Sequence, residues 1–178
     1  MPEKVSVQAE KIRTLGDRVL RQPAFQITRI DAESRDLVGR MIKSMYEAKG
    51  IGLAAPQIGV SKQVLVIDTS SGTDMNKLIV LMNPVIIEMR GQELVEEGCL
   101  SLPGFRAKIQ RRLQVLVEGI NLEGKTYKLE AEGLLAQALQ HEIDHLRGVL
   151  FIDHLPFFKK VKYWKSLREI KKGTKRNR

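Results

Sequence analysis

Residues 141–145, with the sequence His-Glu-Ile-Asp-His, have the residue types and spacing of a metal-dependent hydrolase. In a helix, side chains four positions apart differ by about 40° in direction, so the imidazoles of His141 and His145 can bind one cation. Glu142 is too poorly placed to be a good ligand, but its carboxylate can reach a water molecule on the metal and accept a proton. This is the arrangement that hydrolysis requires.

These residues also have a structural interpretation. Leu134, Ala138, His141 and His145 recur at spacings of four, three and four, which predicts that both histidines lie on the inward face of their helix. They could then be core histidines satisfied by hydrogen bonds, with Glu142 in a surface ion pair. Because the motif is short but chemically complete, we favour the metal site.

Two histidines leave a third protein ligand to find, and the candidates are Cys99, His154 or an unplaced carboxylate. His154 lies nine residues beyond His145, where a solvated or locally bonded histidine is the more common case. Cys99 is the better candidate because Gly98 and Pro103 flank it and can form a rigid loop that aims the sulfur. A lone cysteine is, however, as often a small buried apolar residue.

A third segment with chemical potential is residues 50–57, with the sequence Gly-Ile-Gly-Leu-Ala-Ala-Pro-Gln. Its small side chains allow a ligand to approach the backbone, so that its N–H and C=O groups can bind an extended peptide. The side-chain amide of Gln57 can donate a hydrogen bond to a carbonyl oxygen. On spacing alone, a helix end followed by a tight turn explains this segment better.

Two helices are predicted to position these residues. Asp31 can cap a helix in which apolar residues recur at spacings of three and four until Gly50 ends it. A second helix, which carries the two histidines, begins near Gly133 and runs to about Leu146, where Gly148 stops it.

The strands are predicted as a block between these helices. Short apolar runs at residues 64–67, 78–82 and 85–87 read as buried strands, the last two interrupted by Asn83-Pro84. Residues 113–117 and 127–129 flank a turn signal and predict a hairpin. Because the strands do not alternate with helices, we expect an α+β domain with mostly antiparallel pairing rather than a doubly wound fold.

Composition narrows the class of protein. A chain of 178 residues that is 43% hydrophobic predicts one domain with a substantial core, which excludes a disordered tail protein. Its apolar stretches are far shorter than the roughly 20 residues needed to cross a bilayer. The single cysteine excludes an internal disulfide. Residues 1–20 lack an apolar signal core and contain three acids, so we expect a soluble cytosolic protein or the mature form of an organellar one.

The net charge of +9 arises entirely at the C-terminal end. Residues 1–156 contain 20 basic and 20 acidic side chains, whereas residues 157–178 contain ten bases and one acid. Apolar residues recur among these bases at roughly helical spacing, which predicts a basic amphipathic helix with a frayed end from residue 171. We expect residues 1–156 to form a single catalytic metallohydrolase domain, and residues 157–178 to be a basic helix and tail rather than a separate domain.

Taken together, three segments resemble the signature motifs of the peptide deformylases, and residues 15–20 and 103–106 look most like the bacterial and plastid-type branch. The three segments read GxGLAAxQ at residues 50–57, EGCLS at 97–101 and QHExDHL at 140–146, in the order and approximate spacing of that family. The resemblance extends over about residues 12–155. It implies an α+β fold in which antiparallel sheets surround the helix that carries the two histidines.

The resemblance also implies an activity, namely removal of the N-formyl group from the N-terminal formylmethionine of nascent polypeptides with release of formate. It implies that Cys99, His141 and His145 bind one divalent metal ion, which is Fe²⁺ in most bacterial members, and that Glu142 is the catalytic acid and base. Since cellular supply rather than intrinsic affinity decides the resident metal, Zn²⁺, Ni²⁺ or Co²⁺ can be present after purification.

For the substrate, the resemblance implies that Gln57 and the backbone N–H of Leu100 polarise the formyl oxygen, and that Ile51 and Gly52 hold the substrate backbone. We further expect Leu134 and Ile51 to supply apolar walls for the methionine side chain. For the basic C-terminal helix, the simplest interpretation is a solvated helix packed on the domain. One acid among ten bases exceeds what solubility requires, so we hypothesise weak, salt-sensitive binding to ribosomal RNA, with no DNA or membrane partner.

Two other functions fit parts of the sequence. A metallopeptidase that cleaves internal peptide bonds also uses the His-Glu-x-x-His pattern, but its usual third ligand is a histidine or carboxylate rather than an upstream thiolate. An RNA-binding module with a structural metal would explain the basic end of the chain. It requires a closed site with four protein ligands, and the sequence offers three.

Overall fold

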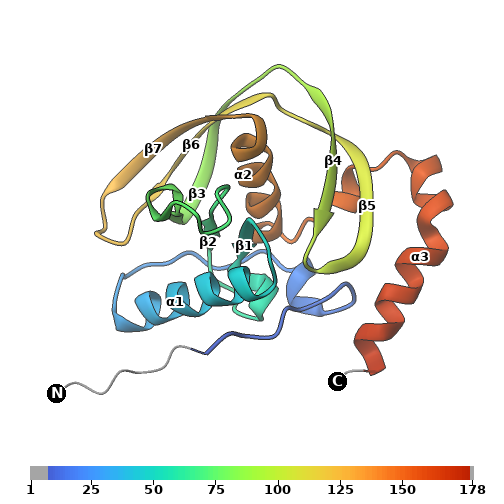
Figure 1. The fold of residues 1–178 in the computed structure, drawn as a ribbon, viewed down its shortest axis with the longest axis horizontal. Helices are drawn as coiled ribbons and strands as arrows, with labels where there is room; N and C mark the ends of the chain where they lie inside the picture. The colour runs from blue at the N-terminus through green and yellow to red at the C-terminus, as the bar shows by residue number, and fades with distance from the viewer. Residues whose placement is uncertain (1–7, 177–178) are drawn as a thin grey trace.

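The structure of the chain, a computed structural model, describes residues 8–176 (Figure 1). Its longer elements, in chain order, are α1 (Ala32–Glu47), β1 (Gly52–Ala54), β2 (Val64–Ile67), β3 (Ile79–Arg90), β4 (Glu93–Cys99), β5 (Leu102–Arg111), β6 (Gln114–Ile120), β7 (Thr126–Glu132), α2 (Gly133–Leu146) and α3 (Phe157–Arg176). Short 3-10 helices join them: η1 (Arg18–Arg21), η2 (Ala55–Ile58), η3 (Met75–Lys77) and η4 (Phe151–His154).

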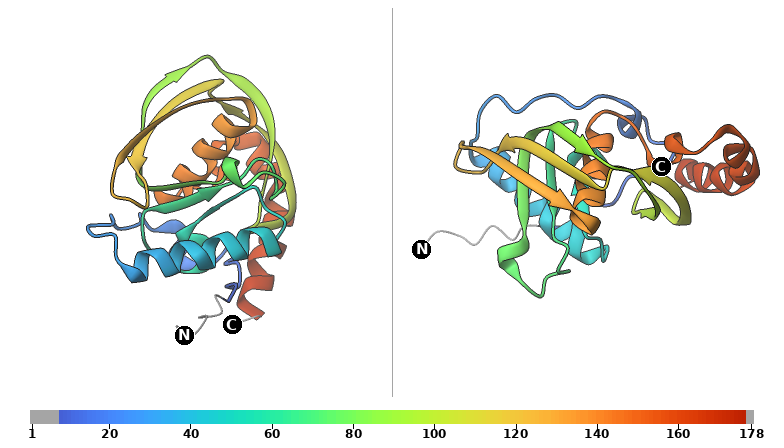
Figure 2. Two further views of the ribbon diagram at one scale, coloured as in Figure 1. Left: turned by 60° about the vertical axis from the view of Figure 1, so that its left-hand side comes forward. Right: turned by 90° about the horizontal axis from the view of Figure 1, so that it is seen from above.

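The strands form two antiparallel sheets. Five of them pair in the order β1-β2-β3-β6-β7, and β4 pairs with β5 in a separate two-stranded sheet. Helix α2 lies between the two sheets, and α3 lies on the far side of β5 from α2 (Figures 1 and 2). The predicted α+β class, with antiparallel sheets around the helix that carries the two histidines, is therefore confirmed.

Helix α2 covers the predicted residues, whereas α1 begins after the predicted cap, Asp31, but ends at Glu47 rather than just before Gly50. The Asp31 carboxylate caps α1 by accepting a hydrogen bond from the backbone N–H of Ser34 at 3.0 Å. Gly148, with a φ of 75°, follows the end of α2 in the left-handed conformation that glycine adopts most easily. The buried face of α2 packs on the five-stranded sheet and brings both histidines into the interior.

The predicted break at Asn83-Pro84 is wrong, because β3 runs without interruption from Ile79 to Arg90. The register with β6 shifts between Met82 and Val85, so the proline sits at a bulge where no ladder hydrogen bond is lost. Asn83 has a φ of 50° and bonds through its side chain to both the N–H and the C=O of Ile27. These side-chain bonds stabilise the irregular strand.

Two further predictions need correction. Residues 97–99, which were expected in a rigid loop, are the last residues of β4, and only Leu100 and Ser101 form the turn to β5. Residues 171–176, which were predicted to belong to a frayed end, are helical, since α3 continues to Arg176; residues 177–178 lie outside the described residues. Within residues 8–176, no helix is both long and apolar enough to span a bilayer.

Candidate metal centre and active site

Three metal-ligating side chains converge at the centre of the molecule. His141 and His145 project from the buried face of α2, and Cys99 meets them from the end of β4. The two Nε2 atoms lie 3.2 Å apart, and Cys99 Sγ lies 3.2 Å from His145 Nε2. All three ligand atoms are within 4.8 Å of one another.

This geometry fits one divalent cation. Ligand atoms arranged as a tetrahedron about 2.0–2.3 Å from an ion are roughly 3.3–3.8 Å apart, close to the two separations of 3.2 Å. A thiolate with two imidazoles also suits the softer divalent ions. The other candidate ligand, His154, lies elsewhere: its Nε2 contacts Asp144 Oδ2 at 2.7 Å and is not part of the cluster.

Glu97 orients the first histidine from behind. Its carboxylate accepts a hydrogen bond from His141 Nδ1 at 2.8 Å and from Arg111 Nε at 2.7 Å. Because Nδ1 carries the proton that Glu97 accepts, the lone pair of His141 Nε2 points toward the cluster. Although burial alone would raise the pKa of Glu97, the hydrogen bonds from His141 and Arg111 lower it to about 2, so the carboxylate is charged.

The same network continues to the protein surface. Arg111 is buried, and its guanidinium also donates to Asp144 Oδ2 at 2.6 Å, which in turn contacts His154. Glu97 belongs to one of the predicted motifs, but neither Glu97 nor Arg111 was predicted to have a role in the site. A signal was available: Arg111 occupies an inward position in the alternating pattern of β5, and an arginine there needs a buried carboxylate.

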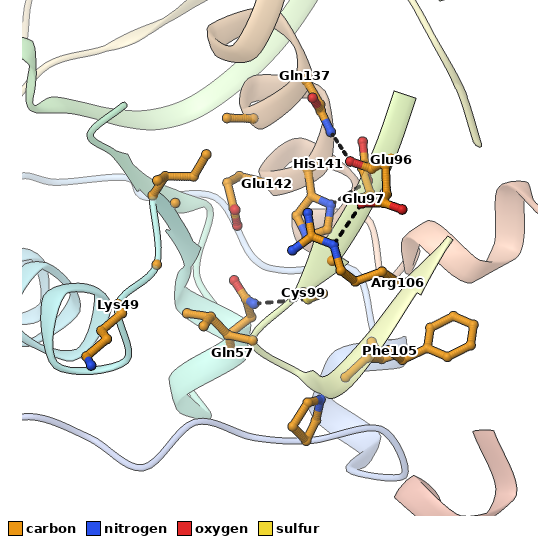
Figure 3. A pocket seen from close by; sticks show the side chains of 18 of the residues that line it. Lys49, Gln57, Glu96, Glu97, Cys99, Phe105, Arg106, Gln137, His141 and Glu142 are labelled. Atoms are coloured by element: carbon orange, nitrogen blue, oxygen red, sulfur yellow. Dashed lines mark hydrogen bonds and ion pairs between the residues drawn. The ribbon is translucent and has the colours of Figure 1, made fainter. Parts of the chain in front are cut away.

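Glu142 lies in the cleft beside the cluster (Figure 3). The residue is only 4% exposed, and burial raises the pKa of its carboxyl group to about 7. A carboxylate with a pKa near the working pH is well suited to accept and return a proton. Space for it comes from Gly52, since a Cβ atom on that residue would lie 2.5 Å from Glu142 Oε1.

Gln57 is held with its amide nitrogen toward the cluster. Its Oε1 accepts a hydrogen bond from the backbone N–H of Ala54 at 2.8 Å, which leaves Nε2 facing Cys99 Sγ at 3.6 Å and Ser101 Oγ at 3.3 Å. Figure 3 shows the amide pointing into the same space as Glu142. The tight turn predicted for residues 50–57 therefore includes a short strand, β1, and then η2, which carries Gln57.

A cleft of about 570 Å³ opens over these groups. The sequence-predicted residues Ile51, Gly52, Leu100 and Leu134 all line it, together with Cys99, His141, Glu142 and Gln57. Leu134 is half exposed on α2. β1 lies at the edge of its sheet and pairs with β2 only, so it leaves one backbone edge without a strand partner among the described residues. Eight of the nine predicted site residues thus line the cleft. The ninth, His145, contacts His141, which is part of the cleft wall.

Comparison with known proteins gives the family. The model of the polypeptide deformylase family matches residues 9–161. The chain belongs to this family. A peptide deformylase from Halothermothrix orenii is 51% identical over 143 residues, covering 80% of this chain and 91% of the relative. One from Thermodesulfovibrio yellowstonii is 47% identical over 161 residues, covering 90% and 98%.

Solved structures of deformylases agree with the fold. The enzyme from Legionella pneumophila has a TM-score of 0.86 and 40% identity, covering 94% of this chain and 98% of that one. The enzyme from Thermus thermophilus has a TM-score of 0.87 and 38% identity, covering 93% and 99%. The chain is therefore a hydrolase that removes the N-formyl group from nascent polypeptides, and the metallopeptidase alternative is not favoured. The family is metal-dependent, which agrees with the cluster of Cys99, His141 and His145.

Proposed function

We propose that Cys99, His141 and His145 hold one divalent cation, Fe²⁺ in the cell, and that Glu142, Gln57 and Leu100 carry out deformylation around it. The observation that carries this proposal is the convergence of three ligand atoms within 4.8 Å beside a buried carboxylate in an open cleft. When bound, such a cation supplies Lewis acidity, which lowers the pKa of water to about 7 and polarises a carbonyl oxygen.

Glu142 moves the proton in this proposal. Its carboxylate accepts a proton from the attacking water and later delivers it to the departing amine nitrogen, which leaves as the free N-terminus. Both steps require a carboxyl group that changes protonation state easily near neutral pH. The elevated pKa, about 7, supports this role, as does the absence of any hydrogen-bond partner for Oε2 among residues 8–176.

Two hydrogen-bond donors stabilise the charge that develops on the formyl oxygen. These are the Gln57 Nε2 amide, fixed by its bond from Ala54, and the backbone N–H of Leu100 in the turn after Cys99. A preorganised donor of this kind contributes about 3–4 kcal/mol to transition-state stabilisation. The bond that fixes the Gln57 side chain supports its role, because little reorganisation of this donor is then needed during the reaction.

The substrate backbone binds along the open edge of β1, where Ile51 and Gly52 offer their N–H and C=O groups to an extended peptide. Leu134 and Ile51 form apolar walls for the methionine side chain. The half-exposed position of Leu134 in the cleft supports this, because a ligand there would bury its apolar surface.

Replacing Leu134 with aspartate should raise KM for formyl-Met-Ala-Ser by about tenfold, because a charge would then face a buried apolar side chain. The measurement is steady-state formate release, with Leu94→Asp as the control, since Leu94 is an exposed leucine that does not line the cleft. Unchanged kinetics would remove Leu134 from the methionine pocket.

The metal and the activity are tested together by anaerobic purification, elemental analysis and an assay of formate release. Formyl-Met-Ala-Ser should be deformylated, and the same peptide without the formyl group should not be cleaved. One iron per chain with formate release supports the proposal. Zn²⁺, Ni²⁺ or Co²⁺ can occupy the site after purification in air, and iron absent under strict anaerobic conditions would reject Fe²⁺ as the resident ion.

A second proposal concerns α3, which we infer binds ribosomal RNA weakly. Its exposed side carries Phe157, Val161 and Trp164 among the ten bases of residues 157–178. Aromatic rings stack on bases, and lysines and arginines release counterions from phosphates. This placement would bring a cytoplasmic enzyme to nascent chains. We likewise propose that residues 1–156 form a single catalytic domain, and that residues 157–178 are a basic helix and tail rather than a separate domain. The protein would act in a bacterial cytoplasm or as a mature organellar protein.

Reversing three charges on α3, as in Lys162→Glu/Lys165→Glu/Arg168→Glu, should abolish co-sedimentation with ribosomes at low salt and flatten its dependence on salt concentration. The control reverses three exposed bases elsewhere, Arg35, Lys77 and Lys125, and matches the change in net charge. Equal loss of co-sedimentation in both variants would mean that net charge, not α3, determines binding.

A further inference from the structure

The segment of residues 13–15 bonds to both parts of the chain that carry the proposed donors to the formyl oxygen. The backbone N–H of Arg13 donates to the carbonyl oxygen of Gln57 at 2.7 Å. Two residues later, the backbone N–H of Leu15 donates to the carbonyl oxygen of Ser101 at 2.9 Å. One extended segment is thus bonded to η2, which carries Gln57, and to the turn that follows Cys99.

Helix α3 holds this segment from the other side. Thr174 Oγ1 donates to the carbonyl oxygen of Leu15 at 2.8 Å and lies 2.6 Å from Thr14 Oγ1. One turn earlier, the side chain of Lys171 approaches Gly16 so closely that a Cβ on that glycine would lie 3.0 Å from its Cγ. Leu15 is therefore bonded through its N–H to the turn of Leu100 and Ser101, and through its C=O to α3.

The same face of α3 also packs against the cleft wall. The ring of Tyr163 meets that of Phe105 edge to face, with the centroids 5.2 Å apart, and Phe105 lines the cleft. Leu167 and Ile170 pack on the cluster of buried residues that also includes Leu15 and Leu102 and against which Cys99 packs.

These contacts divide α3 into two faces. Tyr163, Leu167, Ile170 and Thr174 recur at spacings of four, three and four and face the protein, whereas Phe157, Val161 and Trp164 are exposed on other sides of the helix. The four inward side chains contact other residues of this chain, so binding to an external partner does not account for them.

We propose that α3 positions Gln57 and the turn at Leu100 through residues 13–15, and that Thr174 is the positioning residue through which it acts. The inference rests on the role proposed for Gln57 and Leu100 as donors to the formyl oxygen. Thr174 touches neither substrate nor metal ligand. It fixes the carbonyl group of Leu15, and the backbone bonds of Leu15 and Arg13 hold Ser101, the neighbour of Leu100, and Gln57 in place.

The test compares three single variants of the full, metal-loaded chain on formyl-Met-Ala-Ser. Thr174→Val keeps the shape but removes the hydroxyl, and should lower kcat about fivefold with KM unchanged, since a displaced donor weakens the transition state more than the bound substrate. Thr174→Ser keeps the hydroxyl and should restore wild-type kcat. Ser166→Ala removes a hydroxyl from an exposed position of the same helix and should leave both constants unchanged.

Amide hydrogen exchange supplies a readout that does not depend on activity. In Thr174→Val, the Leu15 amide should exchange about tenfold faster than in the wild type, while amides in the middle of α2 keep their protection. Unchanged kcat and exchange in Thr174→Val, or equal losses in the valine and serine variants, would overturn the proposal. Gln57→Ala is measured in parallel: full activity there would reject the role given to Gln57, whereas exchange at Leu15 still decides whether α3 holds the segment.

Discussion

Replacing Glu142 with glutamine should lower kcat/KM for formyl-Met-Ala-Ser by about 10²–10⁴-fold, the range expected when a general acid-base group is lost. Glutamine has nearly the same volume and keeps one acceptor, but it cannot bind and release a proton near neutral pH. Because Glu142 is buried, the neutral amide should not destabilise the fold, and it removes a carboxyl group that burial already makes costly to ionise.

The measurement is formate release together with metal content and thermal unfolding for the wild type, Glu142→Gln and Glu130→Gln. Glu130 is a residue of β7 that lies outside the cleft, so its substitution controls for the chemical change alone. A mutant as active as the wild type, with one metal per chain, would show that Glu142 is not the proton carrier. Loss of metal together with activity would point instead to a ligand role.

The parts of the fold that could be predicted from sequence are those fixed by local signals. Helices α1 and α2 have strong apolar periodicity with a capping aspartate or a terminating glycine, and the β6–β7 hairpin follows its turn signal. The pairing of His141 with His145 follows from helix geometry alone. Each of these features depends on residues that are close to one another in the sequence.

Features that depend on distant partners could not be predicted in this way. The sequence left Cys99 and His154 open as the third ligand, because that choice depends on how β4 packs against α2. The bulge at Asn83 depends on side-chain bonds to Ile27, a segment 56 residues away. Strand β1, with three residues, is too short to show an alternating pattern. Strand β5 does alternate, but its pairing with β4 depends on packing that the sequence does not show. Of these features, the resemblance to a known family indicated the third ligand, Cys99.

Because Gly52 has no side chain, the carboxylate of Glu142 has room beside β1. It lies on β1, directly opposite Glu142, and an added Cβ would meet Glu142 Oε1 at 2.5 Å and Cγ at 3.2 Å. Real Cβ atoms do not approach other atoms so closely, and the buried carboxylate has little free space into which it can move. The φ of Gly52 is not positive, so strain from a left-handed backbone plays no part.

Gly52→Ala should therefore lower kcat/KM by about 10²-fold, the cost expected when a catalytic group is displaced by about 1 Å. Gly173→Ala, where an added Cβ has no neighbour within 4 Å, controls for the change of residue type. The two mechanisms for such a loss, a displaced Glu142 or a blocked substrate backbone, make different predictions in the Gly52→Ala/Glu142→Gln double mutant. If the alanine acts through Glu142, the double mutant should be no slower than Glu142→Gln alone, because there is no proton carrier left to displace. A further loss of about 10²-fold would mean that the methyl group blocks the peptide along β1 instead.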